Sequence, residues 1–211
     1  MREWRADTPG IPDAYFIRDE VPMTKEEVRA VIISKLRLKK DQIVYDIGAG
    51  SGSVSIEMGL FLEGGAVYAL ERKKKALNLI RKNVNKFKLN NINIIEAEAP
   101  AGIAALPEAD RIFIGGSGGH LAAIIETADQ KLKDTGRIVL TAVTINTLTA
   151  AVQTLEKLDY GLDIVNIAVT RTKKISNCQM FRALNPVYII SAQKKLKVEK
   201  EKSRKRSIEL S

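Results

Sequence analysis

A glycine-rich loop directly after a short apolar run is the feature that most restricts what this chain can fold into. Residues 42–47 (QIVYDI) predict a buried strand, and residues 46–52 (DIGAGSG) lead from it into a segment of helical character. Glycine permits a tight turn and the close approach of a ligand to the backbone. A strand, glycine loop and helix in this order indicate an α/β domain that binds a ligand at the carboxyl ends of its strands.

Short apolar runs and helical patterns alternate along the rest of the chain. Further strands are expected at residues 66–70, 92–95, 111–114, 136–143, 162–170 and 187–192, and helices from 24, at 53–62, 73–87, 121–132 and 145–158. This alternation predicts a Rossmann-like, mostly parallel seven-stranded sheet with right-handed crossovers. The last two strands have no helix between them, so we expect an antiparallel edge hairpin joined by residues 171–185.

The ends of the chain differ from its middle. Residues 1–22 contain several prolines and predict an irregular arm, and Thr24-Lys25-Glu26-Glu27 has the pattern of a helix capping box. Residues 194–211 are nearly all charged near their start and predict a flexible basic tail. We therefore expect one domain over residues 1–193, followed by that tail.

The composition excludes several classes of protein. The chain has 211 residues and one cysteine, Cys178, so an intramolecular disulfide or a zinc site with two cysteines is ruled out. No apolar run suits a signal peptide or a membrane span, and a cytoplasmic protein is expected. The formal net charge of +9 favours an acidic partner, either nucleic acid or a small polycarboxylate. A lysine-rich surface that serves solubility explains the charge equally well.

The spacing within the glycine loop bears on the ligand. Gly48, Gly50 and Gly52 form G-x-G-x-G, whereas a dinucleotide fingerprint reads G-x-G-x-x-G. Asp46 before the first glycine would repel a pyrophosphate, but its carboxylate can accept from an ammonium group. The loop therefore favours a ligand with a cationic amino acid moiety over NAD.

Two acidic positions extend the predicted cofactor site. Glu71 ends the second strand, about 20 residues beyond the loop, where a carboxylate can take both hydroxyls of a ribose. Glu98 and Ala99 follow the third strand, where an acidic side chain and backbone groups can hold an adenine edge. Alone, either glutamate reads as a surface residue; together with the loop they predict S-adenosyl-L-methionine as the cofactor.

Several segments make the resemblance more specific. They are GIPD (10–13), FIRD (16–19), PMTKEEVR (22–29), DIG (46–48), AP (99–100) and FIGGSGG (113–119). In these the chain resembles the decarboxylating cobalt-precorrin C15-methyltransferases of cobalamin biosynthesis over nearly its whole length, to about residue 193. PMTKEEVR and IGGSGG are the specific segments, because generic methyltransferases lack them.

The resemblance implies a substrate and a reaction. A corrin precursor with carboxylate arms, a cobalt-precorrin, would be methylated at C15 and would lose the carboxyl group of its C12 acetate as carbon dioxide. Methylation would leave an iminium-like system that accepts the electrons of the departing carboxylate, so no metal site is expected. The resemblance also implies a homotetramer and a contact of Thr24 with the cofactor.

Residues that bind the substrate are expected in three places. Gly116, Ser117 and Gly118 lie in a loop before a helix and can bind a carboxylate there. Thr144 follows the fifth strand, and Arg182 lies in the late segment that also holds Arg171, Lys173 and Lys174. These cations are equally well read as solvated side chains. His120, the only histidine, more often marks a helix start than a catalytic group.

Three other functions remain open at this stage. An RNA methyltransferase can share the fold, but the chain lacks the [DN]-P-P-[YFW] motif of amino-group methylases after the fourth strand and has few aromatics for base stacking. An NAD-dependent oxidoreductase is disfavoured by the glycine spacing and Asp46. A non-catalytic binding protein that keeps a cofactor pocket is compatible with the sequence.

Overall fold

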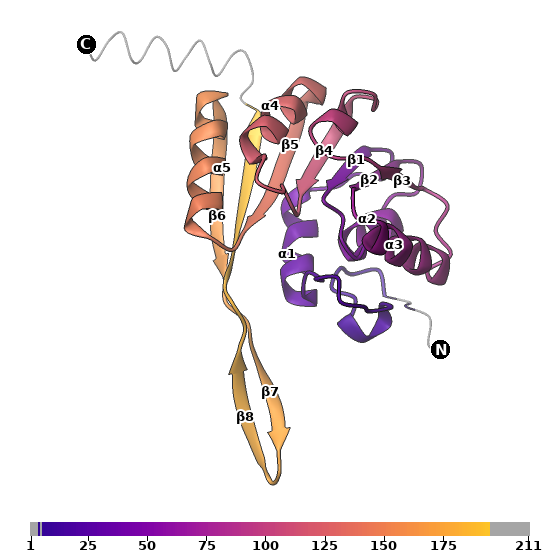
Figure 1. Cartoon of the computed structure of the whole chain (residues 1–211), viewed down its shortest axis with the longest axis vertical. Helices are drawn as coiled ribbons and strands as arrows, with labels where there is room; N and C mark the ends of the chain where they lie inside the picture. The colour runs from indigo at the N-terminus through magenta and orange to yellow at the C-terminus, as the bar shows by residue number, and fades with distance from the viewer. Residues whose placement is uncertain (1–3, 5, 195–211) are drawn as a thin grey trace, which may run out of the picture.

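The structure, a computed structural model, describes Trp4 and residues 6–194 (Figure 1). The predicted basic tail therefore lies outside the described residues, apart from Lys194. The strands are β1 Ile43–Ile47, β2 Ala66–Glu71, β3 Ile92–Glu96, β4 Ala109–Ile114, β5 Leu132–Ala142, β6 Tyr160–Ile167, β7 Thr170–Ile175, β8 Cys178–Ala183 and β9 Val187–Lys194. The helices are α1 Glu26–Leu36, α2 Ser53–Phe61, α3 Lys74–Lys86, α4 Leu121–Lys131 and α5 Ile145–Lys157, with short 3-10 turns η1 Asp13–Tyr15 and η2 Ala101–Ile103.

The main sheet has seven strands in the order β3-β2-β1-β4-β5-β9-β6. The pairs among β1 to β5 are parallel, and β9 runs antiparallel to both β5 and β6. The expected Rossmann-like α/β class and the antiparallel pairing of the last two main-sheet strands are confirmed. Because β9 is inserted between β5 and β6, only β6 of these last two main-sheet strands lies at an edge of the sheet, and β3 forms the opposite edge.

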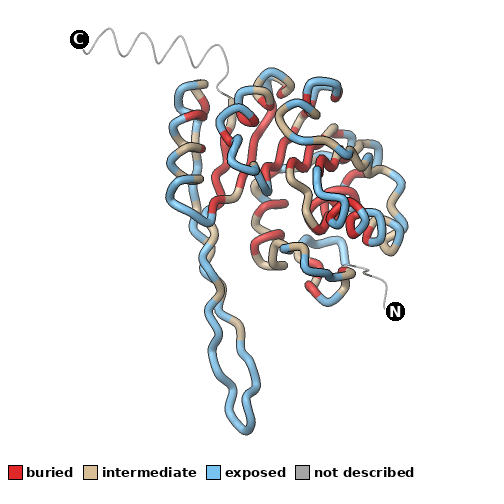
Figure 2. Tube along the Cα trace, in the orientation of Figure 1, coloured by how far each residue is buried: buried red, intermediate tan, exposed pale blue. Residues whose placement is uncertain are grey.

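Helices cover both faces of the sheet, and the buried core lies between the layers (Figures 1 and 2). On one face, α1 and α2 pack on β1, β2, β4, β5 and β9 through side chains such as Ile32, Met58 and Phe113. On the other face, α4 and α5 pack on the strands through Ile125, Leu155 and their neighbours. Helix α3 lies beside α2 and buries Ala76, Leu77 and Ile80.

The segment between the last two main-sheet strands corrects the sequence prediction. The strand expected at 162–170 ends at Ile167, and residues 171–185 are not simply a joining segment. Strands β7 and β8 form a separate antiparallel ribbon that projects from the body of the molecule (Figure 1). Its residues are largely exposed (Figure 2). The two strands are joined by a tight turn at Ser176-Asn177, where Ser176 adopts a positive φ of 52°.

The start of α1 also differs from the prediction. The helix begins at Glu26 with Lys25 as its N-cap residue, and no side chain caps it. Thr24 therefore does not cap the helix, and Glu27 pairs with Arg171 on β7, with atoms 2.6 and 2.8 Å apart. In a capping box the Glu27 carboxylate would accept from the backbone N–H of Thr24. Here it binds Arg171 instead, which is distant in the sequence.

The N-terminal arm is held against the domain by a buried cation. Arg29 on α1 is 0% exposed, and its guanidinium pairs with Asp13 of the arm at 2.9 Å and with Glu57 of α2 at 2.8 Å. The same guanidinium donates to the carbonyl oxygens of Ile11 and Thr24. Glu57 also accepts from the backbone N–H of Gly10 at 2.8 Å. The arm is thus ordered by charge-assisted hydrogen bonds, which are stronger than neutral ones.

Candidate functional site

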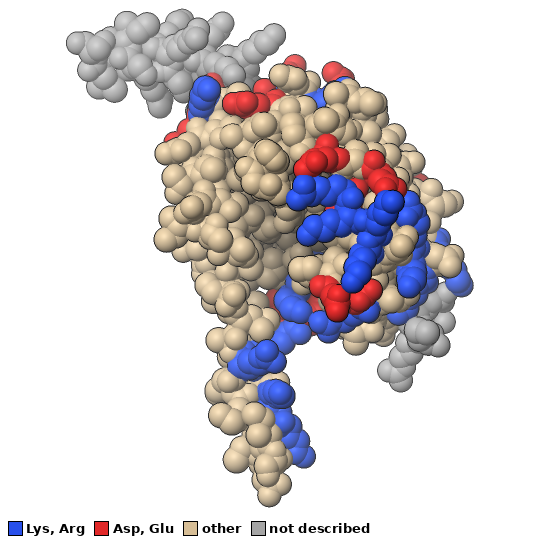
Figure 3. Space-filling view, viewed as in Figure 1, with Lys and Arg blue, Asp and Glu red and all other residues tan. Residues whose placement is uncertain are grey.

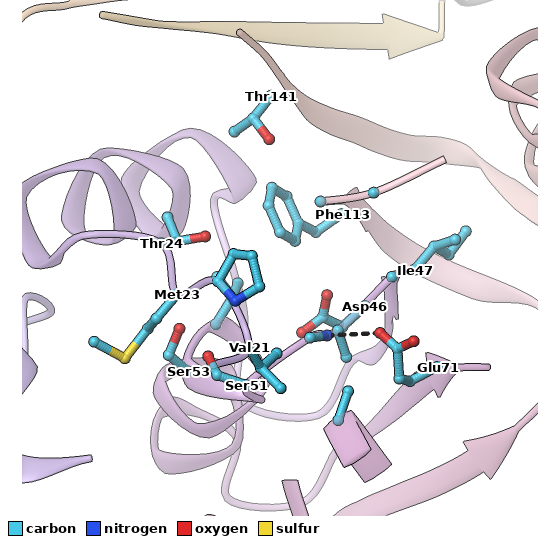
Figure 4. Close-up of a pocket in the computed structure, with 18 of the residues that line it drawn as sticks. Val21, Met23, Thr24, Asp46, Ile47, Ser51, Ser53, Glu71, Phe113 and Thr141 are labelled. Atoms are coloured by element: carbon cyan, nitrogen blue, oxygen red, sulfur yellow. Dashed lines mark hydrogen bonds between the residues drawn. The ribbon is translucent and has the colours of Figure 1, made fainter. Parts of the chain in front are cut away.

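A pocket of about 670 Å³ opens at the carboxyl ends of the parallel strands, where open α/β sheets bind ligands (Figure 4). The loops after β1, β2 and β3 line one half, together with the arm and the start of α1. The ends of β4 and β5, the root of the ribbon and the start of β9 line the other half. The pocket therefore brings together segments that are far apart in the sequence.

The glycine loop after β1 and the loop after β4 touch each other. A Cβ placed on Gly48 would lie 2.5 Å from the carbonyl oxygen of Gly116, and Gly48 has a φ of +74°. Gly50 and Gly52 also have positive φ, at 56° and 76°. Only glycine adopts such angles without strain. All three glycines of the G-x-G-x-G pattern thus adopt left-handed backbone conformations, and the first also makes a close backbone contact with Gly116.

Asp46 presents an unsatisfied buried oxygen in this pocket. Asp46 is only 1% exposed. Its Oδ2 accepts a hydrogen bond from the Ser55 hydroxyl. Its Oδ1 has no hydrogen-bond partner among the described residues. Burial raises the pKa of Asp46 to about 7; the Ser55 hydrogen bonds oppose the rise, and the nearby Glu71 adds to it. Because an unpaired buried acceptor is costly, this oxygen suits a ligand donor such as an ammonium group.

The Glu71 carboxylate is fixed by backbone donors at the end of β2. Its Oε2 accepts from the N–H of Gly50 at 3.0 Å (Figure 4), and its Oε1 accepts from the N–H groups of Arg72 and Lys73, each at 2.9 Å. A carboxylate offers about four lone-pair sites, so an acceptor site remains on Oε2. Glu71 is therefore positioned to accept from a ligand hydroxyl without any rearrangement of its own.

An ion pair joins two of the loops that line the pocket. Arg72 on the loop after β2 pairs with Glu98 on the loop after β3. The Arg72 guanidinium also lies beside Gly118, because a Cβ placed there would be 3.3 Å from its Nη2. All three residues line the pocket, as does Ala99. The loops after β2, β3 and β4 therefore meet at Arg72, a residue that the sequence prediction passed over.

The structure brings most of the predicted site residues together. Ten of the thirteen line the pocket: Thr24, Asp46, Gly48, Gly50, Glu71, Glu98, Ala99, Gly116, Ser117 and Gly118. Gly52 stands just behind the loop, as the N-cap residue of α2, where a Cβ would lie 3.1 Å from Ile80. Thr144 caps α5 by accepting from the N–H of Thr147 at 3.1 Å. Arg182 lies exposed on β8, and neither it nor Thr144 lines the pocket.

Two further residues that the sequence analysis considered lie outside the pocket. His120 is the exposed N-cap residue of α4. Arg171 pairs with Glu27 and also lies 3.4 Å from Asp13, so its charge is already matched within the chain. Its hydrogen bonds hold the pKa of Glu27 below its usual value. Arg171 therefore joins the ribbon to α1 and to the arm.

The sequence analysis missed the part that the arm plays in the site. Val21, Pro22 and Met23 line the pocket beside Thr24 (Figure 4). Pro22 and Met23 belong to the PMTKEEVR segment, but their place in the pocket depends on the arm, which the distant Arg29 contacts hold against the domain. Among the described residues, no group of three or more His, Cys, Asp and Glu side chains is placed to hold a metal ion. No helix in that part of the chain is long and apolar enough to cross a membrane.

The residues of the first half fit S-adenosyl-L-methionine. The free Asp46 oxygen suits its ammonium group, Glu71 suits the ribose hydroxyls, and the glycine loop leaves room for close approach to the backbone. An S-adenosylmethionine-dependent O-methyltransferase from Thermotoga maritima has a similar fold. The TM-score is 0.71 at 19% identity, with 83% of this chain and 67% of that chain covered. Similarity at this identity shows the fold alone, and this fold together with a pocket lining that fits the cofactor indicates the class of Rossmann-like S-adenosylmethionine-dependent methyltransferases.

Comparison with known proteins narrows the class. The chain belongs to the precorrin methyltransferase domain family, which it matches over residues 14–194. A probable cobalt-precorrin-6B C(15)-methyltransferase (decarboxylating) from Sulfurisphaera tokodaii is 43% identical over 189 residues, covering 88% of this chain and 98% of the relative. The crystal structure of a precorrin-6y C5,15-methyltransferase from Geobacter metallireducens superposes with a TM-score of 0.84 at 48% identity, covering 90% of this chain and 100% of that one. The family resemblance drawn from the sequence motifs is confirmed.

Proposed function

We propose that this protein methylates C15 of a cobalt-precorrin with S-adenosyl-L-methionine as donor and removes the carboxyl group of the C12 acetate as carbon dioxide. The observation that carries the proposal is the free buried oxygen of Asp46 beside the fixed carboxylate of Glu71, in a chain of the precorrin methyltransferase domain family. Relatives named for this reaction span nearly the full length of the chain and support the choice of substrate.

Each half of the pocket has its own task in this proposal. Asp46 accepts from the ammonium group of the donor, Glu71 accepts from the ribose hydroxyls, and Glu98 with Ala99 faces the adenine edge. Gly116, Ser117 and Gly118 precede α4, where backbone N–H groups and the Ser117 hydroxyl suit a substrate carboxylate. Arg182, on the ribbon, supplies a cation for another carboxylate arm.

In the proposed reaction, the main role of the side chains is to position the methyl donor and the acceptor. When bound, S-adenosyl-L-methionine supplies an activated methyl group. The chain orients the two reactants and keeps water from the reacting atoms, which are the main contributions an enzyme makes to such a displacement. Phe113 and Val187 form apolar walls of the pocket that suit this exclusion. No strong base is required in this proposal, because the acceptor carbon is electron-rich and enamine-like.

The test is a reaction with purified protein, cobalt-precorrin-6B and donor carrying an isotopically labelled methyl group. The proposal expects one labelled methyl group in the product together with release of carbon dioxide. Glu71→Ala serves as the matched low-activity variant, because it lacks the ribose acceptor. Transfer of label to RNA in a parallel reaction, with none to the precorrin, would instead support an RNA methyltransferase.

Oligomeric state and location are further parts of the proposal. A homotetramer and a cytoplasmic location stay predictions from the sequence and its family resemblance. The exposed ribbon supports an assembly, because an isolated two-stranded hairpin has little stability of its own. Light scattering of the purified protein measures the number of copies directly. A single domain over residues 1–193 likewise stays a prediction.

A further inference from the structure

The two halves of the pocket differ in chemical character. The half assigned to the donor contains the carboxylates of Asp46, Glu71 and Glu98. The other half is lined by apolar side chains from β4, from the residue after β5, from the residues just before β7 and just after β8, and from β9: Phe113, Val143, Val169, Leu184 and Val187. Since the donor occupies the polar half in the proposed function, the apolar half is left for the methyl acceptor.

This apolar half continues out of the pocket onto the surface. Val143, directly after β5, is 68% exposed, and Ile145 at the start of α5 is 81% exposed. Tyr188 on β9 pairs in register with Ala142 of β5 and is 39% exposed. Between Val143 and Ile145, the Thr144 side chain turns to cap α5. Exposed large apolar side chains that continue a pocket mark a binding surface.

One of the cations in this region lines the pocket itself, and others lie on the ribbon. Lys73 lines the pocket and has no ion-pair partner among the described residues. On the ribbon, Arg182 is the register partner of Arg171, and Lys173 lies two residues along, so all three share one face. Arg171 on that face reaches Glu27 of α1, which places the face toward the start of α1. Lys and Arg side chains gather at α3 and along the ribbon in one view of the surface (Figure 3).

An apolar platform with cations around it has the chemistry of a particular ligand. A flat conjugated ring buries its face on branched aliphatic side chains, and carboxylates on its edge pair with lysine and arginine. We infer that Val143 and Ile145 form the surface that receives the ring face of the tetrapyrrole, and that they set the affinity for the methyl acceptor. This inference rests on the proposed function and adds two specificity-determining residues to it.

The inference separates acceptor binding from donor binding. Val143 and Ile145 lie on the β5–α5 side, whereas the donor groups follow β1, β2 and β3. A change at Val143 or Ile145 therefore alters affinity for a tetrapyrrole and leaves affinity for S-adenosylhomocysteine unchanged. Both side chains are exposed, so replacing them has little effect on the free energy of unfolding.

The experiment compares Val143→Asn and Ile145→Asn with wild type and with Leu60→Asn. Leu60 is 42% exposed near the end of α2, the end directed away from the mouth, and is the matched control. Binding of uroporphyrin, a fluorescent planar tetrapyrrole with carboxylate arms, is titrated in the presence of S-adenosylhomocysteine. We expect each mouth variant to bind the porphyrin about tenfold more weakly, and the Leu60 variant to bind as wild type does.

Two companion measurements make the outcome decisive. S-adenosylhomocysteine affinity and molar mass by light scattering are measured for every variant. Weaker porphyrin binding at unchanged donor-analogue affinity and unchanged mass supports the inference. Unchanged porphyrin binding, or weaker binding only where the mass also changes, overturns it. Failure of the wild type to methylate cobalt-precorrin-6B tests the proposed function separately.

Discussion

Gly48 and Gly116 lie in backbone contact across the floor of the pocket. A Cβ on Gly48 would fall 2.5 Å from the Gly116 carbonyl oxygen and 2.8 Å from its nitrogen and Cα. Alongside, the N–H of Gly115 donates to the carbonyl oxygen of Ile47 at 2.9 Å. The glycine loop after β1 and the loop after β4 therefore constrain each other's position.

A methyl group at position 48 tests this contact. Gly48→Ala places a Cβ against backbone atoms that cannot swing away, at a φ of +74°. We expect the free energy of unfolding to fall by about 3 kcal/mol or more, and S-adenosylhomocysteine binding to be lost. Gly64→Ala is the control, because nothing lies within 4 Å of a Cβ there. Urea denaturation measures both variants, and equal stability of the two would contradict the contact.

The raised pKa of Asp46 predicts that donor binding depends on pH. Burial raises this pKa to about 7, and only the ionised carboxylate can pair with an ammonium group. We expect S-adenosylhomocysteine affinity to fall as the pH drops from 8 to 6 in the wild type. Asp46→Asn should bind weakly at all these pH values. Calorimetric titration of both proteins provides the measurement, and a flat pH profile for the wild type would refute the role of Asp46.

The same group predicts how stability changes with pH. The folded pKa of about 7 lies above the ordinary value of 3.8, so this carboxyl stabilises the folded protein below pH 3.8 and loses that contribution as the pH rises through 7. Asp46→Asn removes the cost of burying the charge. We expect its free energy of unfolding to exceed that of the wild type by a few kcal/mol at pH 8, with the difference shrinking toward pH 4. Denaturation at both pH values in the ligand-free state tests the sign.

Glu71 is predicted to govern affinity for the ribose. Glu71→Gln keeps the size of the side chain and an acceptor oxygen, but it loses the charge that strengthens hydrogen bonds to ligand hydroxyls. At roughly 1.5–3 kcal/mol for each charge-assisted bond, removal of the carboxylate in Glu71→Ala should weaken S-adenosylhomocysteine binding by at least tenfold. Glu71→Gln should fall between that variant and the wild type.

The control for this series is Glu63→Ala. Glu63 is exposed and, among the residues that the structure describes, forms its ion pair with Lys40 at the surface, so its loss should leave binding unchanged. Because Glu71 also accepts from three backbone N–H groups, circular dichroism and thermal melting of each variant show whether the loop itself is kept. Wild-type affinity in a folded Glu71→Ala would remove Glu71 from the donor site.

Local patterns in the sequence predicted the sheet and most of the residues that line the first half of the pocket. These patterns are the glycine spacing, the acidic residue before the first glycine and the glutamate at the end of the second strand. Each depends on the conformation of a few adjacent residues, so it can be recognised in a short stretch of sequence. The main-sheet strands from β1 to β5 and helices α2 to α5 fall close to their expected ranges. Thr24 failed as a helix cap because Glu27, its supposed partner, is taken by Arg171, which is distant in sequence.

Long-range placement could not be predicted from the sequence. Strands β7 and β8 have no buried residue, so their sequence lacks the hydrophobic pattern by which strands are recognised. The part that Arg72 plays in the site could not be recognised in the sequence either, because its neighbours Glu98 and Gly118 lie in other loops. The order of the arm depends on Arg29, a charged residue whose complete burial no periodicity predicts.

Arg29 is therefore predicted to contribute both to the stability of the fold and to donor binding in the pocket. Arg29→Met leaves the buried Glu57 carboxylate without its cation and leaves Asp13 with only its longer contacts to Arg171 and Lys25, at 3.4 and 3.9 Å, which should cost about 3–5 kcal/mol. Arg29→Lys keeps the positive charge but lacks the planar guanidinium whose N–H groups reach Asp13, Glu57 and two carbonyl oxygens. Its free energy of unfolding should therefore fall between those of the wild type and Arg29→Met. Lys40→Met breaks an exposed pair with Glu63 and should cost less than about 1 kcal/mol. Because the arm lines the pocket, S-adenosylhomocysteine affinity should fall in the order wild type, Lys, Met at position 29. Equal affinity in folded Arg29→Met would show that the arm is not needed for donor binding.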